Sequence, residues 1–251
     1  MKNNFLSLFE HPKPIIGMIH LSGDTPEERL AIAKMEINTM VKNGIDAVLV
    51  ENYFGGISDV ENILSWLASQ DSILYGINLL SQTMPEPLAF NLASKYRAKF
   101  IQVDSVAGHL PTSTSPVNRD SLCGQEIEKI RSNFAIPLIG GVRFKYQPVL
   151  SGRTLEEDLK IGMQRCDAIA ITGAGTGIET DLKKIQSFRD VVGDFPLVVA
   201  AGMTAENCVQ SMQIADACIV GSYLKDTYKD DGIVCERHVQ ELVEKIRQLR
   251  K

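Results

Sequence analysis

A repeating unit governs this sequence: a short apolar run ends in glycine or polar residues, and a helix-like pattern follows it. Eight such units can be traced along the 251 residues, at a spacing of about 30 residues, the length of one strand–helix unit. The runs are almost continuously apolar, as in parallel strands that are covered on both faces. The expected strands are residues 14–20, 47–51, 73–79, 100–103, 137–142, 168–172, 197–201 and 217–220.

Eight strand–helix units in a chain of this length predict an α/β fold, a single (β/α)8 TIM barrel over residues 1–251. An open doubly wound sheet is the alternative, but it would need an unusually large number of strands. No stretch has the composition of a linker between two domains. Residues 1–13 precede the first strand, and their apolar side chains predict an N-terminal extension that caps the bottom of the barrel.

Three of the expected helices are preceded by Ser or Thr with glutamate three positions later, which is the pattern of a capping box. The pairs are Thr25 and Glu28, Ser58 and Glu61, and Thr154 and Glu157. Each pair predicts the N-terminus of a helix, so we expect helices to follow the first, second and fifth strands at these positions.

Composition excludes several classes of function. The formal net charge of −5 and the pI near 5.5 argue against nucleic acid as the main partner, because a protein that reads the phosphate backbone needs a basic face. No apolar run approaches the roughly 20 residues that span a bilayer, and the start of the chain lacks a signal-peptide core. The five cysteines are scattered and form no C-x-x-C pair, which favours a reduced, cytoplasmic protein.

The last three apolar runs all end in glycine. Gly173, Gly175 and Gly177 follow the sixth run, Gly202 the seventh and Gly221 the eighth. Glycine lets backbone N–H groups approach a ligand, and a helix that starts just beyond adds the positive end of its dipole. Because the ends of strands 7 and 8 are the usual phosphate position of a TIM barrel, these glycines predict a site for phosphate or a similar anion. Tight turns without a ligand are the alternative, and the G-x-G-x-G spacing does not match a dinucleotide fingerprint.

Catalysis in this fold takes place at the carboxyl ends of the strands. The candidate catalytic residues there are His20, Glu51, Asp104 and Lys145. The candidate substrate-binding residues are Asn52, Asn78, Arg143, Thr172, Gly173, Gly202, Thr204, Gly221 and Ser222.

Glu51 or Asp104 would move protons and His20 would assist, while Asn52 and Asn78 would orient hydroxyl groups. Structural hydrogen bonds at the barrel rim are the alternative for each of these residues. Lys145 could bind a phosphate or carboxylate as a point charge, or form a Schiff base.

Two further features leave alternatives open. His20, Glu51 and Asp104 could together bind a divalent metal ion, because the ligand types fit, but the cofactor stays unknown. The loop 105–119 is rich in Ser, Thr and Pro, and a loop of this length is a lid, a binding loop or a disordered excursion.

Five segments resemble the BtpA family of TIM-barrel proteins. They are Pro14–Leu21, Gly44–Asn52, Thr172-Gly173 with Thr176-Gly177, Ala201–Thr204 with Glu206-Asn207, and Ala215-Asp216 with Ile219–Ser222 and Lys225. The similarity covers nearly the whole chain, and G-x-D-A-V-x-V-E-N is its most specific part. The resemblance implies a barrel like those that bind ribulose phosphates. The family includes a photosystem I biogenesis factor and proteins linked to sugar metabolism or described as candidate nucleosidases.

The chain departs from the family pattern after three strands. Only the short segment Leu21–Asp24 follows His20, where the family has a longer loop rich in proline and glycine. The family's Asp-x-Pro-Phe is replaced by Tyr53–Gly56, and its Asp-Val-x-Val-Lys-His by Gly141–Tyr146. An acid and a histidine are thereby lost, which makes a different substrate or a weakened activity plausible.

Together these features predict a cytoplasmic enzyme that acts on a phosphorylated sugar or a nucleotide-like metabolite. Lyase, isomerase and glycosidic cleavage reactions all remain open. The alternative is a non-enzymatic binding or assembly factor, such as a photosystem I biogenesis protein. A homo-oligomer is common among such barrels, but the sequence reveals no interface.

Overall fold

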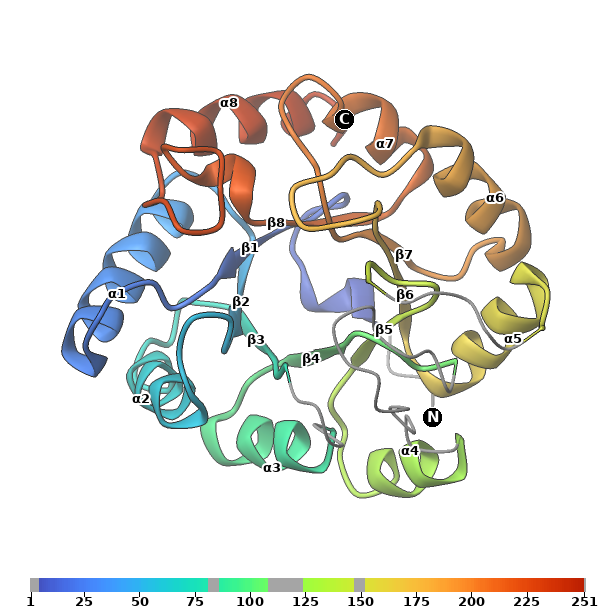
Figure 1. Cartoon of the computed structure of the whole chain (residues 1–251), viewed down its shortest axis with the longest axis horizontal. Helices are drawn as coiled ribbons and strands as arrows, with labels where there is room; N and C mark the ends of the chain where they lie inside the picture. The colour runs from blue at the N-terminus through green and yellow to red at the C-terminus, as the bar shows by residue number, and fades with distance from the viewer. Residues whose placement is uncertain (1–4, 81–85, 108–123, 147–151, 251) are drawn as a thin grey trace.

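Eight parallel strands close into a barrel in chain order, and a ring of helices surrounds it (Figure 1). The computed structural model describes residues 5–80, 86–107, 124–146 and 152–250, and this barrel is formed within them. The strands are β1 (Ile15–Ile19), β2 (Ala47–Glu51), β3 (Tyr75–Asn78), β4 (Phe100–Val103), β5 (Leu138–Gly141), β6 (Ala168–Ile171), β7 (Leu197–Val199) and β8 (Ala217–Val220). The predicted (β/α)8 TIM barrel is confirmed.

Each strand is followed by a helix on the outside of the barrel. The α-helices are α1 (Pro26–Lys42), α2 (Ile57–Leu67), α3 (Glu86–Tyr96), α4 (Gly124–Arg131), α5 (Leu155–Arg165), α6 (Leu182–Val192), α7 (Cys208–Ile214) and α8 (Glu236–Arg247). Two 3-10 helices, η1 (Phe5–Leu8) and η2 (Ser222–Leu224), precede β1 and follow β8. In the described ranges, no helix is long and apolar enough to cross a membrane.

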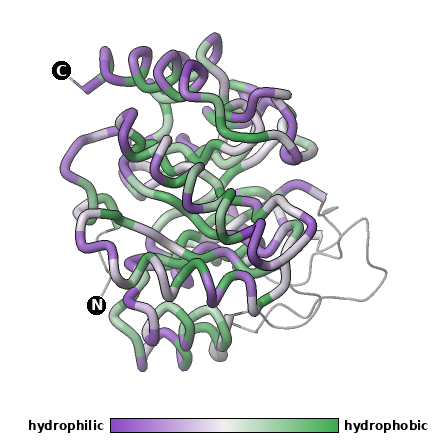
Figure 2. The backbone as a smooth tube through the Cα atoms, turned by 90° about the vertical axis from the view of Figure 1, so that its left-hand side faces the viewer, coloured by the Kyte–Doolittle hydropathy of each residue, from purple (hydrophilic) through white to green (hydrophobic). Residues whose placement is uncertain are grey.

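Alternation along the strands separates two apolar layers. In β1, Ile16 and Met18 belong to the cluster inside the barrel, whereas Ile15 and Ile19 belong to the cluster between strands and helices. The helices themselves alternate between hydrophobic and hydrophilic segments along their turns, as Figure 2 shows. Because successive side chains of a strand point to opposite faces, the next inward position of β1 is His20. The same pleat turns Glu51 and Asn78 inward at the ends of β2 and β3, where the two residues pair in register.

The N-terminal segment lies at the opposite end of the barrel from these polar residues. Phe5 is fully buried, and its ring packs edge-on against Phe100, the first residue of β4, with centroids 6.0 Å apart. Phe9 packs against Phe5 at 5.2 Å. In Figure 1, η1 lies across the centre of the barrel. The segment therefore covers the amino ends of the strands.

Two of the three expected capping boxes are confirmed. Thr25 accepts the backbone N–H of Glu28 and Thr154 that of Glu157, and each glutamate bonds back to the cap. The box predicted at Ser58 and Glu61 is wrong. There α2 begins two residues earlier, after Gly56, whose N–H donates to Asp59 Oδ2 at 2.8 Å.

Glu61 has other partners: its carboxylate accepts from Lys95 Nζ at 2.9 Å and from the Tyr96 hydroxyl at 3.0 Å. Tertiary contacts with α3 thus decide the position of this side chain. The expected loop 105–119 falls mostly outside the described residues.

Candidate functional site

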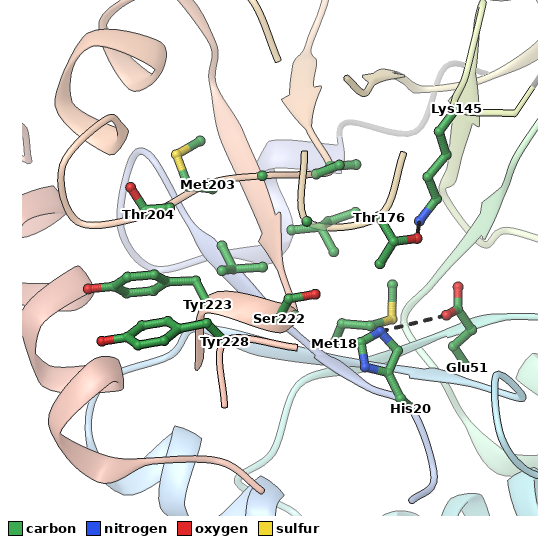
Figure 3. A pocket seen from close by; sticks show the side chains of 17 residues that line it. Met18, His20, Glu51, Lys145, Thr176, Met203, Thr204, Ser222, Tyr223 and Tyr228 are labelled. Atoms are coloured by element: carbon green, nitrogen blue, oxygen red, sulfur yellow. Dashed lines mark hydrogen bonds and ion pairs between the residues drawn. The ribbon is translucent and has the colours of Figure 1, made fainter. Parts of the chain in front are cut away.

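A cavity opens at the carboxyl ends of the strands, the end of the barrel where His20 and Glu51 point inward. Its volume is about 160 Å³, and residues at the ends of β1, β2, β7 and β8 and in the loops after β5 and β6 line it (Figure 3). The cavity brings seven predicted site residues together: His20, Glu51, Lys145, Gly202, Thr204, Gly221 and Ser222.

His20 and Glu51 face each other in this cavity. The imidazole Nε2 lies 3.9 Å from Glu51 Oε2, and each residue is only 4% exposed. Burial raises the pKa of Glu51 to about 7, with Asp104 acting in the same direction and Lys145 against it. Burial, together with the charge of Lys225, lowers the pKa of His20 to about 3. At neutral pH the site therefore holds a neutral imidazole beside a carboxyl group that can gain or lose a proton.

Asn78 links two carboxylates. Its Nδ2 donates to Glu51 Oε1 at 2.7 Å and lies 3.5 Å from Asp104 Oδ1. Gln102, which pairs with Asn78 in the sheet, also donates to Asp104 Oδ1, at 3.3 Å. Asp104 and Asn78 do not line the cavity itself. Asn78 fixes the carboxyl group of Glu51 by its hydrogen bond, and Asp104 lies on the other side of the same amide.

Lys145 approaches the cavity from the loop after β5. Its Nζ donates to Thr176 Oγ1 at 3.1 Å, and its backbone N–H donates to Thr172 Oγ1 at 2.6 Å. Thr172 thus supports the lysine and does not line the cavity. In Figure 3 the Lys145 side chain extends toward the same space as Glu51. An ammonium group at this position can stabilise a negative charge that develops near Glu51.

The opposite side of the cavity consists of the turns after β7 and β8. A Cβ atom added to Gly221 would lie 2.8 Å from the Cε1 atom of His20, so only glycine lets the β8 turn pack on this ring. Ser222 begins η2 directly after it. This is the place where TIM barrels commonly bind phosphate, between the loops after strands 7 and 8 and the start of a short extra helix.

Two predicted binding residues in this region have structural partners. The Thr204 N–H donates to Asn207 Oδ1 at 2.8 Å, while its hydroxyl accepts backbone N–H groups at the start of α7. Gly173 packs on the backbone, because an added Cβ would lie 2.5 Å from the carbonyl oxygens of Ile178 and Glu179. Gly173 is therefore required for packing of the β6 loop and does not line the cavity.

Asn52 and Arg143 are also directed elsewhere. Asn52 exchanges two hydrogen bonds with the backbone of Leu80, at 3.0 and 2.7 Å. The Arg143 guanidinium binds Asp158 at 2.9 Å and the carbonyl oxygen of Arg153 at 2.8 Å. Neither residue lines the cavity.

Sequence reasoning missed several residues of the site. Thr176, Met203, Tyr223 and Tyr228 line the cavity. The Tyr53 hydroxyl is close to Asp230, which together with burial raises its pKa to about 12. Thr176 lies inside the glycine-rich run and Met203 in a segment that resembles the BtpA family, so both could have been found from those signals. Neither signal marks the three tyrosines.

A metal site is not formed by the candidate ligands. Within the part of the chain that the structure describes, no group of three or more His, Cys, Asp or Glu side chains could hold a metal ion. The trio His20, Glu51 and Asp104 does not form such a cluster, because Asn78 stands between the two carboxylates.

Comparison with known proteins agrees with the fold. The model of the BtpA family matches residues 11–248. An uncharacterized protein of Pyrococcus abyssi is 25% identical, over 95% of this chain and 97% of that protein. The photosystem I biogenesis protein BtpA of Synechocystis is 24% identical, over 86% of this chain and 82% of that protein.

A solved structure shares the architecture. Thiamine phosphate pyrophosphorylase from Pyrococcus furiosus superposes with a TM-score of 0.63 at 13% identity, over 95% of this chain and 97% of that one. At this level of identity, the likeness concerns the fold alone.

Proposed function

The chain belongs to the BtpA family, and from this premise we propose that it is a cytoplasmic enzyme acting on a phosphorylated sugar or a nucleotide-like metabolite. One observation carries the proposal. A single cavity joins a buried carboxyl group with a pKa of about 7, Glu51, to the glycine turns after β7 and β8. One small molecule in this cavity can therefore exchange a proton with Glu51 while its anionic group lies on the turns after β7 and β8.

The reacting end of the ligand would lie between Glu51 and Lys145. Glu51 takes or returns a proton, because its pKa lies near neutrality, where a general acid or base is most effective. Lys145 stabilises an enolate or another oxyanion. His20 stays neutral and donates or accepts a hydrogen bond beside them. Lyase, isomerase and glycosidic cleavage reactions all use these elements.

The phosphate end would lie on the Gly221–Ser222 turn and beside Gly202. Gly202 and Gly221 both line the cavity, and neither carries a side chain that would stand between a ligand and the backbone. The first N–H groups of a helix such as η2 have no partner within that helix and are suited to anions. The Pyrococcus furiosus neighbour, which shares the fold, is itself named for a phosphorylated compound, thiamine phosphate.

A second candidate function follows from one relative. The Synechocystis protein is named for photosystem I biogenesis, so a non-enzymatic assembly role is the alternative. The two functions differ in the use of the cavity, because an assembly factor has no need of proton transfer at Glu51.

Ser222→Asp tests the anion site. A carboxylate at the start of η2 should weaken the binding of ribose 5-phosphate roughly a hundredfold or more, since two like charges a few ångströms apart repel strongly near a protein surface. Isothermal titration calorimetry measures the dissociation constant. In a melting experiment with ribose 5-phosphate at a hundred times that dissociation constant, the free energy of unfolding of the wild-type protein should rise by about 2.7 kcal/mol.

Ser222→Ala is the matched control and should bind within a few-fold of wild type. Equal affinity of the Asp and Ala variants would place the phosphate elsewhere. If wild-type protein binds neither ribose 5-phosphate nor a nucleoside 5′-monophosphate, the proposed function is wrong and the assembly role is favoured.

A further inference from the structure

A fully buried ion pair lies behind the cavity. Lys225 is 0% exposed, and its ammonium group binds the carboxylate of Glu36, which is 1% exposed and belongs to α1. Lysine is almost never fully buried without a partner. Apolar residues of similar volume often replace such a pair with no loss of stability. Stability alone therefore does not explain why these two charges are placed here.

The pair fastens the chain that follows β8. Residues 225–234, here named the β8 hairpin, are closed by a bridge between Lys225 and Val234. Glu36 Oε1 also accepts the N–H of Val234 at 3.2 Å, so one carboxylate holds both ends of the hairpin on α1. The carbonyl oxygen of Lys225 lies 2.9 Å from His238 Nδ1 on α8.

The segments that precede and follow Lys225 in the chain both belong to the site. On one side, the Lys225 N–H donates to the carbonyl oxygen of Ser222 at 3.1 Å, which ties the lysine to the turn proposed for phosphate. On the other side, the hairpin carries Tyr228, which lines the cavity. The hairpin also carries Asp230, whose charge acts on His20.

We propose that Lys225 and Glu36 form a positioning pair of the site, which holds the Gly221–Ser222 turn and the β8 hairpin against His20. The Cβ that glycine lacks at position 221 would lie 2.8 Å from the His20 ring, so a small movement of the turn changes this contact. This inference rests on the proposed function for the phosphate contact, but its effect on His20 can be measured without a ligand.

The charge of Lys225 has a consequence of its own. The charged or titratable groups that face His20 are Glu51 from β2, Tyr53 from the loop after β2, Lys145 from the loop after β5, and Lys225 and Asp230 after β8. After burial, Lys225 is the strongest influence that lowers the pKa of His20. Removing this cation should therefore favour protonation of the imidazole.

The double variant Lys225→Met with Glu36→Gln tests the pair. Methionine replaces the lysine stem, and the amide oxygen introduced at position 36 can still accept the N–H of Val234, so the protein should fold. In ¹H–¹⁵N NMR titrations, the pKa of the His20 ring should rise, because the Lys225 charge that lowers it is removed and the turn and hairpin are released from α1. Calorimetry with inorganic phosphate should give a dissociation constant roughly tenfold weaker than that of wild type.

The control is Arg250→Met with Asp46→Asn, which removes an ion pair at the amino end of β1, the strand that His20 directly follows. It should change stability but neither His20 titration nor phosphate affinity. If the first double variant does not fold, Lys225→Gln with Glu36→Gln takes its place.

An unchanged His20 titration in the folded double variant overturns the inference. The same applies if the control shifts His20 equally, because the pair would then act only through general stability. If wild-type protein does not bind phosphate, the proposed function fails, and the NMR titration still decides the role of the pair.

Discussion

Glu51→Gln is expected to make the protein more stable above pH 7 and to prevent the proton transfer that we propose for this residue. The carboxyl group is 4% exposed, and burial raises its pKa to about 7 from an ordinary value of 4.5. Because the folded-state pKa of Glu51 is raised, its protonated carboxyl group contributes fully to the free energy of unfolding below about pH 4.5. This contribution is lost as the pH rises through 7. At about 1.36 kcal/mol per pKa unit, the loss is about 3 kcal/mol.

Glutamine cannot ionise, so the variant avoids this loss, and its carbonyl oxygen can still accept the hydrogen bond from Asn78. Urea unfolding at pH 5, 6, 7 and 8 should show a smaller decline for the variant than for wild type. The exposed Glu244→Gln on α8 serves as the control and should follow the wild-type curve. An identical decline in all three proteins would show that Glu51 is not the titrating group. With a substrate in hand, turnover should fall about 10²- to 10⁴-fold.

Gly202→Ala is expected to destabilise the barrel by about 3 kcal/mol or more. The residue has a φ of +66°, which costs an L-residue roughly 1–2 kcal/mol. In addition, the new Cβ would lie well under 3.0 Å from the carbonyl oxygen of Ile178 and from the nitrogen of Glu179. Both are backbone atoms, which cannot move aside as a side chain can, and overpacking of this kind costs roughly 1–3 kcal/mol more.

Gly152→Ala separates the two contributions. Gly152 also has a positive φ, +70°, but an added Cβ meets nothing within 4 Å. Its substitution should cost only the conformational part, and the difference in free energy of unfolding between the two variants measures the clash. If Gly202→Ala loses no more stability than Gly152→Ala, the β6 loop is not packed on the β7 turn.

The fold could be predicted from the sequence because its signals are local. Apolar runs that end in glycine mark strands, and the boxes at Thr25 and Thr154 are closed within four residues, so no distant partner is needed. The box at Ser58 was wrong because Glu61 is held by Lys95 and Tyr96 on another helix. Glu61 and Lys95 are 34 positions apart, and a contact over that distance cannot be recognised from a local sequence pattern.

The same distinction explains the site. His20 and Glu51 could be brought together from sequence, since both are inward positions at the ends of neighbouring strands. Arg143 could not be oriented, because Asp158 on α5 decides where its guanidinium lies. The Lys225–Glu36 pair joins residues 189 positions apart, and only the closed barrel brings them into contact.

The closure of the barrel also determines the order in which its parts can assemble during synthesis. Phe5 leaves the ribosome before any of the eight strands, yet the interior cluster that buries it includes Phe100, Val198 and Ala217. β1 likewise needs β8 as its neighbour. The cluster around Phe5 is therefore complete only after β8 has been translated. Until then the nascent chain exposes apolar surface and an unpaired edge of β1. A chaperone can bind these features at this stage.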